Sequence, residues 1–417
     1  MKKLLSLSMA AALGFSGLAH GQETLKMWSI TNELEPVIAD FEAKYDVKVD
    51  LTVVALEDYL SKLIPVLKDK KNAPDLFVAE VQIIKEFVDR GVWANLSKEY
   101  DFDQYKEKIF PYVWGVGTDK NGDVRATSYQ ATPGGFFYRR SIAKQVLGTD
   151  DPVQIEGMMD SWDKFIQVGE KLRDATDGKV KVVAGVEGLS HAFLASRQNP
   201  WVDAGGNLIV DPKMDEYMKV AKELADKNLV GAAQPFTPGW MSGLSNGEVF
   251  GYFLPTWGLH YVIKGNAPDT KGDWAVVQGP SAYFWGGSWI GVNAKSKKKD
   301  LAAKFVEMLT IDDEYMEHWA RSTGDFVSNM VVEDKLSGEL TEDFLNGQNA
   351  HAFFAKAAAA VGELKFVQNM TRYDRALNGA IESATKDYAQ GGLSKEDAMK
   401  GFYEFVQSTF PKVKISQ

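Results

Sequence analysis

Near its start, the chain alternates between short apolar runs and amphipathic runs, and this alternation constrains the fold more than any other feature. Strand-like runs cover Leu25–Ile30, Val47–Val54 and Leu76–Ala79. Apolar residues recur at helical spacing over Glu33–Tyr45, Leu56–Leu67 and Gln82–Arg90, and Gly91 ends the last run. Strand and helix in alternation predict an α/β sheet with parallel strands. Ligands of such sheets bind beyond the carboxyl ends of the strands, which predicts a site near Trp28–Thr31 and Glu80.

A second informative stretch is Trp285–Leu309. It begins with Trp285, Gly286, Gly287, Ser288 and Trp289, continues as a strand-like run over Ile290–Asn293, and passes through a basic turn into a helical pattern over Leu301–Leu309. Two glycines between large aromatic residues allow the backbone to approach a flat ligand that the rings then cover. The alternative is a strand kinked by glycine and packed with core tryptophans.

Further strands are predicted at Val180–Val186 and Val249–Leu254, and the last third of the chain is mostly helical. Asn121-Gly122 lies between strand-like runs and predicts a hairpin turn. The surrounding Asp119–Asp123 also resembles a calcium loop. Its glycine comes two places too early, and Gln130 stands where a bidentate glutamate is required, so the hairpin is favoured and no metal site is expected.

Composition excludes several classes of partner and chemistry. The chain of 417 residues has 57 acidic and 47 basic side chains, which argues against binding to nucleic acid or to anionic lipid. It has no cysteine, so no disulfide, thiolate metal site or lipid-anchor cysteine is expected. Met1–Gly21 is typical of a secretory signal peptide, with Gln22 as the expected mature start. These features predict a free periplasmic protein.

The sequence gives little support for an enzyme. Gly243–Gly247 matches the G-x-S-x-G pattern around Ser245, but a β-rich segment follows the serine where the hydrolase elbow needs a helix. The histidines are scattered, and there is no phosphate loop or dinucleotide fingerprint. The acidic pairs Glu33/Glu35 and Asp312/Asp313 are explained as helix starts. We therefore expect no catalytic residue and no cofactor, and keep a secreted glycoside hydrolase or esterase as the alternative.

The tryptophans indicate a class of ligand. Those near predicted strand ends or in Gly/Pro-rich turns are Trp28, Trp201, Trp240, Trp257, Trp285 and Trp289. Aromatic faces suit sugars, because one face of a pyranose is apolar while its hydroxyls point sideways to polar partners. Packing in the core remains the alternative for each single tryptophan.

The order of several segments resembles the extracellular solute-binding proteins of ABC importers, in particular the sugar-binding family that includes maltose-binding protein. The matching segments are Trp28–Phe41, PDLFVAE at 74–80, Gly134–Gly148, Ser161–Leu172, Asn246–Gly258, the stretch from Trp285 and TGDFVSN at 323–329. The resemblance implies a type II periplasmic-binding-protein fold of class α/β. Each of its two lobes would hold a mostly parallel sheet flanked by helices, and a hinge would join the lobes. Lobe one would comprise 22–131 and 289–328, and lobe two 132–288 and 329–417.

The resemblance also implies ligand contacts. Trp257 would stack on the ligand, Glu80 would accept hydroxyl hydrogen bonds, and Trp285 to Ser288 would form a glycine-rich contact. Polar contacts are carried over to Gln130, Thr132, Arg321, Asp325, Asp374 and Asn378, and Trp28, Trp201 and Trp240 complete the candidates. We expect a monomeric periplasmic protein that captures a mono- or disaccharide by hinge closure and delivers it to ABC permease subunits. A polyol or glycosylated osmolyte is the alternative ligand, and an adhesion protein that delivers nothing is a further alternative function.

Overall fold

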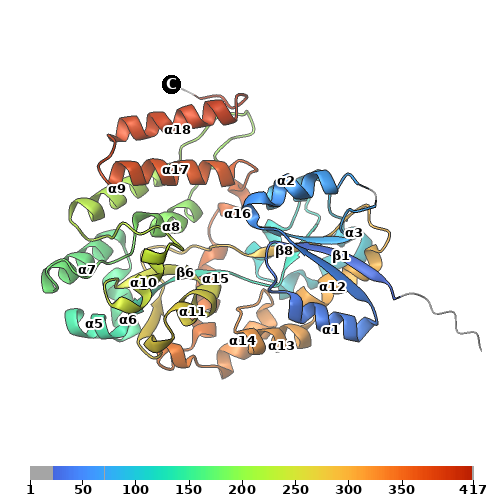
Figure 1. Cartoon of the computed structure of the whole chain (residues 1–417), viewed down its shortest axis with the longest axis horizontal. Coiled ribbons are helices and arrows are strands. Elements are labelled where there is room, and N and C mark those ends of the chain that lie inside the picture. The colour runs from blue at the N-terminus through green and yellow to red at the C-terminus, as the bar shows by residue number, and fades with distance from the viewer. Residues whose placement is uncertain (1–21, 70, 416–417) are drawn as a thin grey trace, which may run out of the picture.

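The computed structural model describes residues 22–69 and 71–415, which form two lobes, each built around its own sheet (Figure 1). The predicted signal peptide, Met1–Gly21, lies outside the described residues. None of the helices in the described part has the length and apolar character that crossing a membrane requires.

The first sheet has five strands in the order β2 (Lys48–Val53), β1 (Thr24–Ser29), β3 (Leu76–Glu80), β8 (Ser288–Val292) and β4 (Thr127–Ser128). The strand β1 pairs in parallel with β2 and β3, as the sequence predicts. The late strand β8 enters between β3 and β4 and is antiparallel to both. Helices α1 (Glu35–Tyr45) and α12 (Lys299–Thr310) cover the same face, where the rings of Phe41 and Phe305 meet at 4.9 Å.

The second sheet differs from the mostly parallel sheet that was expected in each lobe. Its strands, in the order β6 (Gly251–Pro255), β5 (Gly134–Arg139) and β7 (Trp274–Val277), pair antiparallel, so this sheet is not mostly parallel. The two outer strands share one direction, and β5, which enters from the first lobe, runs against both. Among the described residues of this lobe, parallel pairing is limited to the single bridges Lys181–Val249, Val183–Val230 and Asn207–Lys414. Gly185 and a 3-10 turn end the predicted strand Val180–Val186 early.

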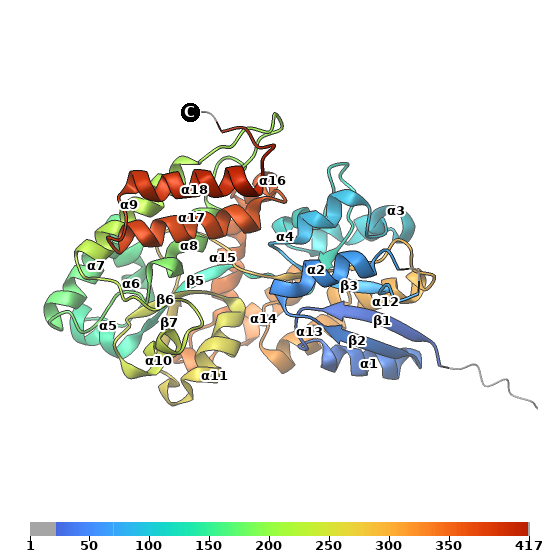
Figure 2. The same ribbon diagram turned by 45° about the horizontal axis from the view of Figure 1, so that its top comes forward.

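The remaining helices are mostly in the second half of the chain, and α17 lies between α9 and α18 at one end of the larger lobe (Figures 1 and 2). They are α2 (Leu56–Val66), α3 (Leu96–Tyr100), α4 (Pro111–Val116), α5 (Arg140–Leu147), α6 (Pro152–Met159), α7 (Trp162–Ala175), α8 (Ser190–Ala195), α9 (Pro212–Asp226), α10 (Pro238–Asn246), α11 (Lys264–Asn266), α13 (Asp313–Thr323), α14 (Met330–Glu339), α15 (Ala350–Gly362), α16 (Phe366–Asn369), α17 (Asp374–Ala389) and α18 (Lys395–Thr409).

Two local predictions have different outcomes. The helix expected over Gln82–Arg90 is wrong: the segment forms two 3-10 turns, Ile84–Glu86 and Val88–Arg90, which Gly91 ends at a φ of +64°. The hairpin around Asn121-Gly122 is confirmed, since Thr118 and Val124 form an antiparallel bridge and Gly122 has a φ of +86°.

Three segments connect the two sheets and lie side by side. The first runs from β4 to β5, the second from β7 to β8, and the third follows α13. Ala131 donates its N–H to Phe326, and Ser328 donates to Tyr129, which joins the first and third segments. Gly134 donates to Tyr283, and Trp285 donates to Thr132, which joins the first and second. We call these three segments the crossing segments.

Candidate functional site

A cavity of about 670 Å³ lies between the lobes, next to the crossing segments. Val81 and Gln82, directly after β3, line it from the first lobe. Phe284 to Gly286 line it from a crossing segment, and α8 and α17 form the walls from the second lobe. Of the residues predicted from the sequence, Trp285, Gly286, Asp374 and Asn378 lie in this cavity.

On α17 and α8, the side chains that line the cavity are spaced so that they lie on one face of each helix. On α17, Leu377, Ile381 and Ala384 are buried in the core. Asp374, Asn378, Glu382 and Lys386 follow one another every four residues and line the cavity. The opposite wall, from the 3-10 turn Val186–Leu189 through α8, contributes Glu187, Ser190, His191 and Leu194. Spacing of this kind places side chains of one helix on a common face.

Aromatic rings gather around Trp285, which lines the cavity. The rings of Trp285 and His191 stack, with centroids 4.2 Å apart and planes at 21°. Trp257 meets Trp285 edge-on at 5.4 Å, and its indole N–H donates to the Trp285 carbonyl at 3.1 Å. Burial lowers the pKa of His191 to about 3, so this ring is neutral at neutral pH. Trp257 therefore holds the backbone of the stretch that presents Trp285.

Phe236 belongs to the same aromatic group and was not among the site residues predicted from the sequence. It is 49% exposed, lines the cavity, and lies 5.8 Å from the Trp285 ring. Its φ of +65° is unusual, because a bulky side chain rarely adopts this left-handed conformation. Backbone strain of this kind concentrates at functional sites. The Pro235-Phe236-Thr237-Pro238 turn is the signal that could have drawn attention to it.

Charged groups also line the cavity. Arg197 donates from Nη2 to Asp374 at 2.7 Å, and Lys386 Nζ lies 3.1 Å from Glu187 Oε1. The second pair is an ion pair. Burial raises the pKa of Glu382 to about 7, and the charge of Glu187 adds to this rise. Glu187, Arg197 and Glu382 were not predicted, since isolated charges in a helical segment usually face water.

The two glycines allow the aromatic stretch to enter this space. Gly286 and Gly287 have φ values of +76° and +102°. A Cβ on Gly286 would lie 3.1 Å from Trp257 Nε1, and one on Gly287 would lie 3.0 Å from the Trp289 ring. Thr132 donates its hydroxyl to the Gly286 carbonyl at 3.0 Å, so it supports the stretch from behind.

Glu80 and Ser288 are opposite residues of the β3–β8 ladder and do not line the cavity, although Glu80 directly precedes Val81, which does. Burial raises the pKa of Glu80 to about 7. Its Oε2 accepts a hydrogen bond from the N–H of Gln82, which lines the cavity. Glu80 thus shapes the turn that forms the first lobe's part of the wall.

The other predicted residues lie outside the cavity lining. Gln130 and Asp325 join two crossing segments through an amide–carboxylate contact of 3.4 Å, and Trp319 also donates to Asp325. Trp28 packs edge-on against Tyr59, and Trp240 against Tyr252. Trp201 is fully buried, where it donates to Asn378 at 2.7 Å and so positions a cavity residue. Trp289 is also buried and donates to the Val113 carbonyl.

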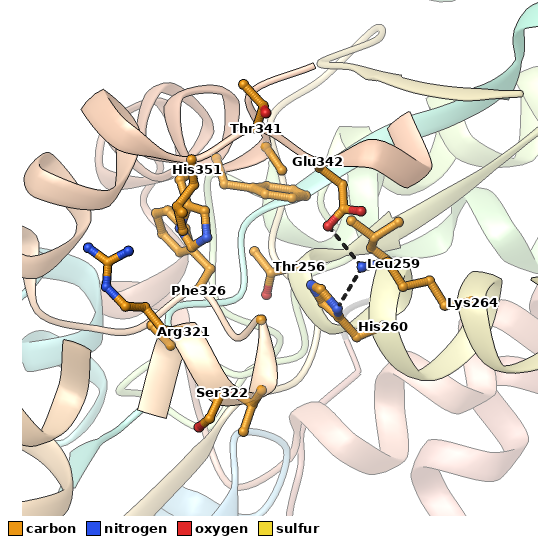
Figure 3. A pocket seen from close by; sticks show the side chains of 16 residues that line it. Thr256, Leu259, His260, Lys264, Arg321, Ser322, Phe326, Thr341, Glu342 and His351 are labelled. Carbon is orange, nitrogen blue, oxygen red and sulfur yellow. Dashed lines mark hydrogen bonds and ion pairs between the residues drawn. The ribbon is translucent and has the colours of Figure 1, made fainter. Parts of the chain in front are cut away.

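Arg321 lines a separate cavity of about 510 Å³, which shares no lining residue with the first (Figure 3). There Lys264 Nζ lies between Glu342 Oε2 at 2.8 Å and His260 Nδ1 at 3.3 Å. Arg321 itself pairs with Glu317 and Glu339. The charged groups of this second cavity thus have partners within the protein.

The groups considered for catalysis have structural partners. Ser245 lies in the last turn of α10 and donates to the Ser242 carbonyl. Asp312 caps α13 and Asp313 is its first residue, as the sequence suggests, and Asp313 also pairs with Lys108. Glu33 does not begin a helix, since α1 starts at Glu35, and it accepts a hydrogen bond from the Tyr129 hydroxyl instead. Among residues 22–69 and 71–415, no three His, Asp or Glu side chains cluster as they would around a metal ion.

The chain is similar to known proteins of one kind, which bind solutes outside the bacterial cytoplasm or carry the name of a binding protein. Residues 37–346 match the family described as bacterial extracellular solute-binding proteins. The diacetylchitobiose binding protein DasA of Streptomyces coelicolor is 24% identical over 381 residues, which cover 85% of this chain and 81% of that protein.

Two solved structures have the same fold. An extracellular solute-binding protein of family 1 matches with a TM-score of 0.79 at 16% identity, over 93% of this chain and 99% of that one. An ABC transporter associated binding protein from B. animalis subsp. lactis Bl-04, solved with β-1,6-galactobiose, matches with a TM-score of 0.72 at 18% identity, over 95% and 100%. These likenesses confirm the predicted two-lobe α/β fold of type II. The family match covers most of the chain, and the protein therefore belongs to the bacterial extracellular solute-binding proteins.

Proposed function

We propose that this protein captures a carbohydrate in the cavity between its lobes and delivers it to the permease of an ABC importer, without catalysing a reaction. The observation that carries this proposal is that the cavity lining combines aromatic rings with polar side chains. Trp285 and Phe236 offer apolar ring surface, while Asp374, Asn378 and Glu187 offer hydrogen-bonding groups. A sugar has one apolar face and a rim of hydroxyls, and it matches such a lining.

The relatives support this class of ligand. DasA is named for binding diacetylchitobiose, and the B. animalis protein was solved with a galactobiose and is associated with an ABC transporter. Of the residues expected from the sequence, we propose Trp285, Gly286, Asp374 and Asn378 as ligand contacts, together with Glu187, His191, Arg197 and Phe236. Trp257, Thr132 and Gly287 shape the contact stretch, and Glu80 and Ser288 border it.

Capture would proceed by bending of the crossing segments. In this proposal lobe one comprises 22–131 and 289–328, lobe two comprises 132–288 and 329–417, and the protein acts as a monomer in the periplasm. The ligand would favour the closed state only by its greater affinity for that state, because Gln82 and the second lobe contact it together only after closure.

The test is a titration of the mature chain with mono- and disaccharides and with polyols, after refolding from denaturant to remove bound ligand. Intrinsic tryptophan fluorescence should change with one compound, and the thermal midpoint should rise. A ligand at a hundredfold excess over Kd contributes about 2.7 kcal/mol to folded stability.

Two substitutions localise the site. Trp285→Ala should remove ring surface from the cavity, and Trp257→Ala should release the Trp285 carbonyl, so both should weaken binding. Tyr403→Ala, on exposed α18, is the control and should bind as the unaltered protein does. Hydrolysis of a test glycoside, or no response to any sugar or polyol, would contradict the proposal.

A further inference from the structure

The polar side chains that α17 presents to the cavity differ in which of their atoms the protein already occupies. Asp374 accepts at Oδ2 from Arg197, and at Oδ1 from the N–H and the hydroxyl of Thr371. Asn378 accepts at Oδ1 from the indole N–H of Trp201 at 2.7 Å. An indole N–H can only donate, so this contact fixes the amide with its oxygen toward Trp201 and its NH2 group turned away.

The NH2 group of Asn378 is available to a ligand. Asn378 lines the cavity, whereas the fully buried Trp201 does not. Among the described residues no acceptor meets Nδ2 of Asn378, and this atom is not one of the buried side-chain atoms that lack a partner. It is therefore accessible, and it can donate to a ligand oxygen in the cavity.

Arg375 lies three residues before Asn378 on the same helix and also lines the cavity. Neither of the two ion pairs in the lining, described above, includes Arg375. Within residues 22–69 and 71–415, no carboxylate oxygen comes within 4.0 Å of its guanidinium nitrogens. Side chains three residues apart on a helix are neighbours, with Cβ atoms about 5–6 Å apart. One ligand group can therefore reach both Arg375 and Asn378.

The wall of the cavity beside these two side chains is open. Gly379 follows Arg375 by one helical turn and also lines the cavity. A Cβ on Gly379 would have nothing within 4 Å, so the space next to the helix is open there. A ligand group can thus approach the backbone of α17 next to Arg375 and Asn378.

The charge of Arg375 is only partly compensated by the protein. Burial raises the pKa of Glu80 to about 7, although the N–H of Gln82 and the charge of Arg375 oppose this rise, so Glu80 is about half ionised at neutral pH. Burial also raises the pKa of Glu382 to about 7, and Asp387 lies about three helical turns from Arg375. A neutral ligand that covered this cation would cost free energy, whereas an anionic group would compensate it.

We propose that the ligand is an acidic sugar, whose carboxylate binds to Arg375 and to the NH2 group of Asn378. A carboxylate has two coplanar oxygens that match the fork of a guanidinium, and its single charge matches one cation. A phosphate monoester carries about −1.5 to −2 charges at pH 7 and would exceed this match. Trp201 acts as a positioning residue, because it turns the amide of Asn378 so that a donor faces the carboxylate. This inference rests on the proposed function and names the class of carbohydrate.

The experiment compares sugars of similar shape that differ in charge, by calorimetric titration of the refolded mature chain. The panel is glucuronate, glucuronamide, glucose and glucose 6-phosphate, together with the galactose series and the corresponding disaccharides. Glucuronamide has the shape of glucuronate without its charge. The uronate should bind roughly tenfold to a hundredfold more tightly than the amide or the parent sugar, as expected for hydrogen bonds to charged groups.

Substitutions of the two binding residues test the assigned contacts. Arg375→Gln removes the cation and should reduce the ratio of uronate affinity to amide affinity about tenfold or more. Arg372→Gln removes the same charge at an exposed residue outside the lining and should leave this ratio unchanged. Asn378→Asp keeps an acceptor for Trp201 but turns a carboxylate oxygen toward the ligand, so it should also lower the ratio about tenfold or more.

Two further variants test the orientation of the amide and the open space. Trp201→Phe removes the N–H and should lower the ratio about threefold to tenfold, with no further loss when Asn378 is replaced by alanine. Gly379→Leu fills the open wall and should weaken uronate binding, although leucine favours a helix more than glycine does and should raise the thermal midpoint. Gly401→Leu, in open space on α18, should raise the midpoint in the same way and leave binding unchanged.

The outcomes separate this inference from the proposed function. Amides or plain sugars that bind as tightly as the uronates would overturn the inference and leave the carbohydrate function standing. Tightest binding of glucose 6-phosphate would overturn it in favour of a phosphate ligand. Equal losses of uronate and amide affinity in Arg375→Gln, or an equal change of the ratio in Arg372→Gln, would also overturn it. If no sugar binds, the proposed function fails first, and this inference fails with it.

Discussion

Two substitutions of Phe236 can separate the effect of its ring on ligand binding from the effect of its strained backbone on stability. Its φ of +65° lies in a region that costs a residue with a Cβ about 1–2 kcal/mol. Glycine avoids this cost but loses about 0.5–1 kcal/mol more conformational entropy on folding than alanine does. Phe236→Gly should therefore be more stable than Phe236→Ala, by about 0.5–1 kcal/mol. At ordinary exposed positions the order is reversed.

The exposed area of the Phe236 ring also sets how much this side chain can contribute to the free energy of ligand binding. A phenylalanine buries about 200 Å² when fully covered, and Phe236 is 49% exposed, so about 100 Å² remains for a ligand to cover. At about 25 cal/mol per Å² this area contributes about 2.5 kcal/mol, or roughly seventyfold in Kd. This value is an upper bound, because a sugar covers only part of the ring. Both variants should lose affinity to the same degree.

Urea unfolding gives the two stabilities, and the fluorescence titration gives the two affinities. Phe405 is the matched control: it is 38% exposed on α18 with ordinary helical geometry. There the glycine variant should be about 1 kcal/mol less stable than the alanine variant, and neither should change ligand binding. The reasoning is refuted if Phe236→Gly is less stable than Phe236→Ala, or if both variants bind as the unaltered protein does.

Two further predictions concern the rest of the site. Burial raises the pKa of Glu382 to about 7 from 4.5, so the folded state retains a proton over this range and folded stability falls as pH rises from about 4.5 to about 7. Glu382→Gln should flatten this dependence in thermal melts between pH 5 and pH 8, whereas melts of Glu404→Gln should follow the unaltered protein; parallel curves for Glu382→Gln and the unaltered protein would contradict the assignment. Gly324 has a φ of +79°, and a methyl group there would overlap the His260 ring, so Gly324→Ala should lower the free energy of unfolding by about 2 kcal/mol or more. Gly338→Ala adds a methyl in open space within α14 and should be neutral or stabilising, so equal effects of the two changes would show that the Gly324–His260 contact is not tight.

Sequence periodicity predicted the elements that bury one face against a sheet. The strands β1, β2 and β3 and the helices α1 and α2 lie where apolar spacing places them, to within a few residues at either end. The direction of the strands in the second sheet was not predictable in this way, because periodicity does not report which strands become neighbours.

The site was predictable only in part, for a related reason. Trp201 and Trp285 are the same residue type in similar turns, yet one is fully buried in the core and the other stacks on His191 at the cavity. Glu187 and Arg197 both line the cavity although they lie at opposite ends of α8, which depends on the packing of the whole lobe. The left-handed backbone of Phe236 is likewise imposed by its surroundings.

The insertion of β8 between β3 and β4 has a consequence for the order of folding. Leu76 pairs with Val292, so the centre of the first sheet is filled by a segment that is synthesised long after its neighbours. Until that segment is available, β3 has one open edge and β4 has no strand to pair with. Pairing across so long a span makes folding slow, since the intervening chain must be ordered first. During synthesis the first lobe can therefore complete its sheet only after most of the second lobe has been made.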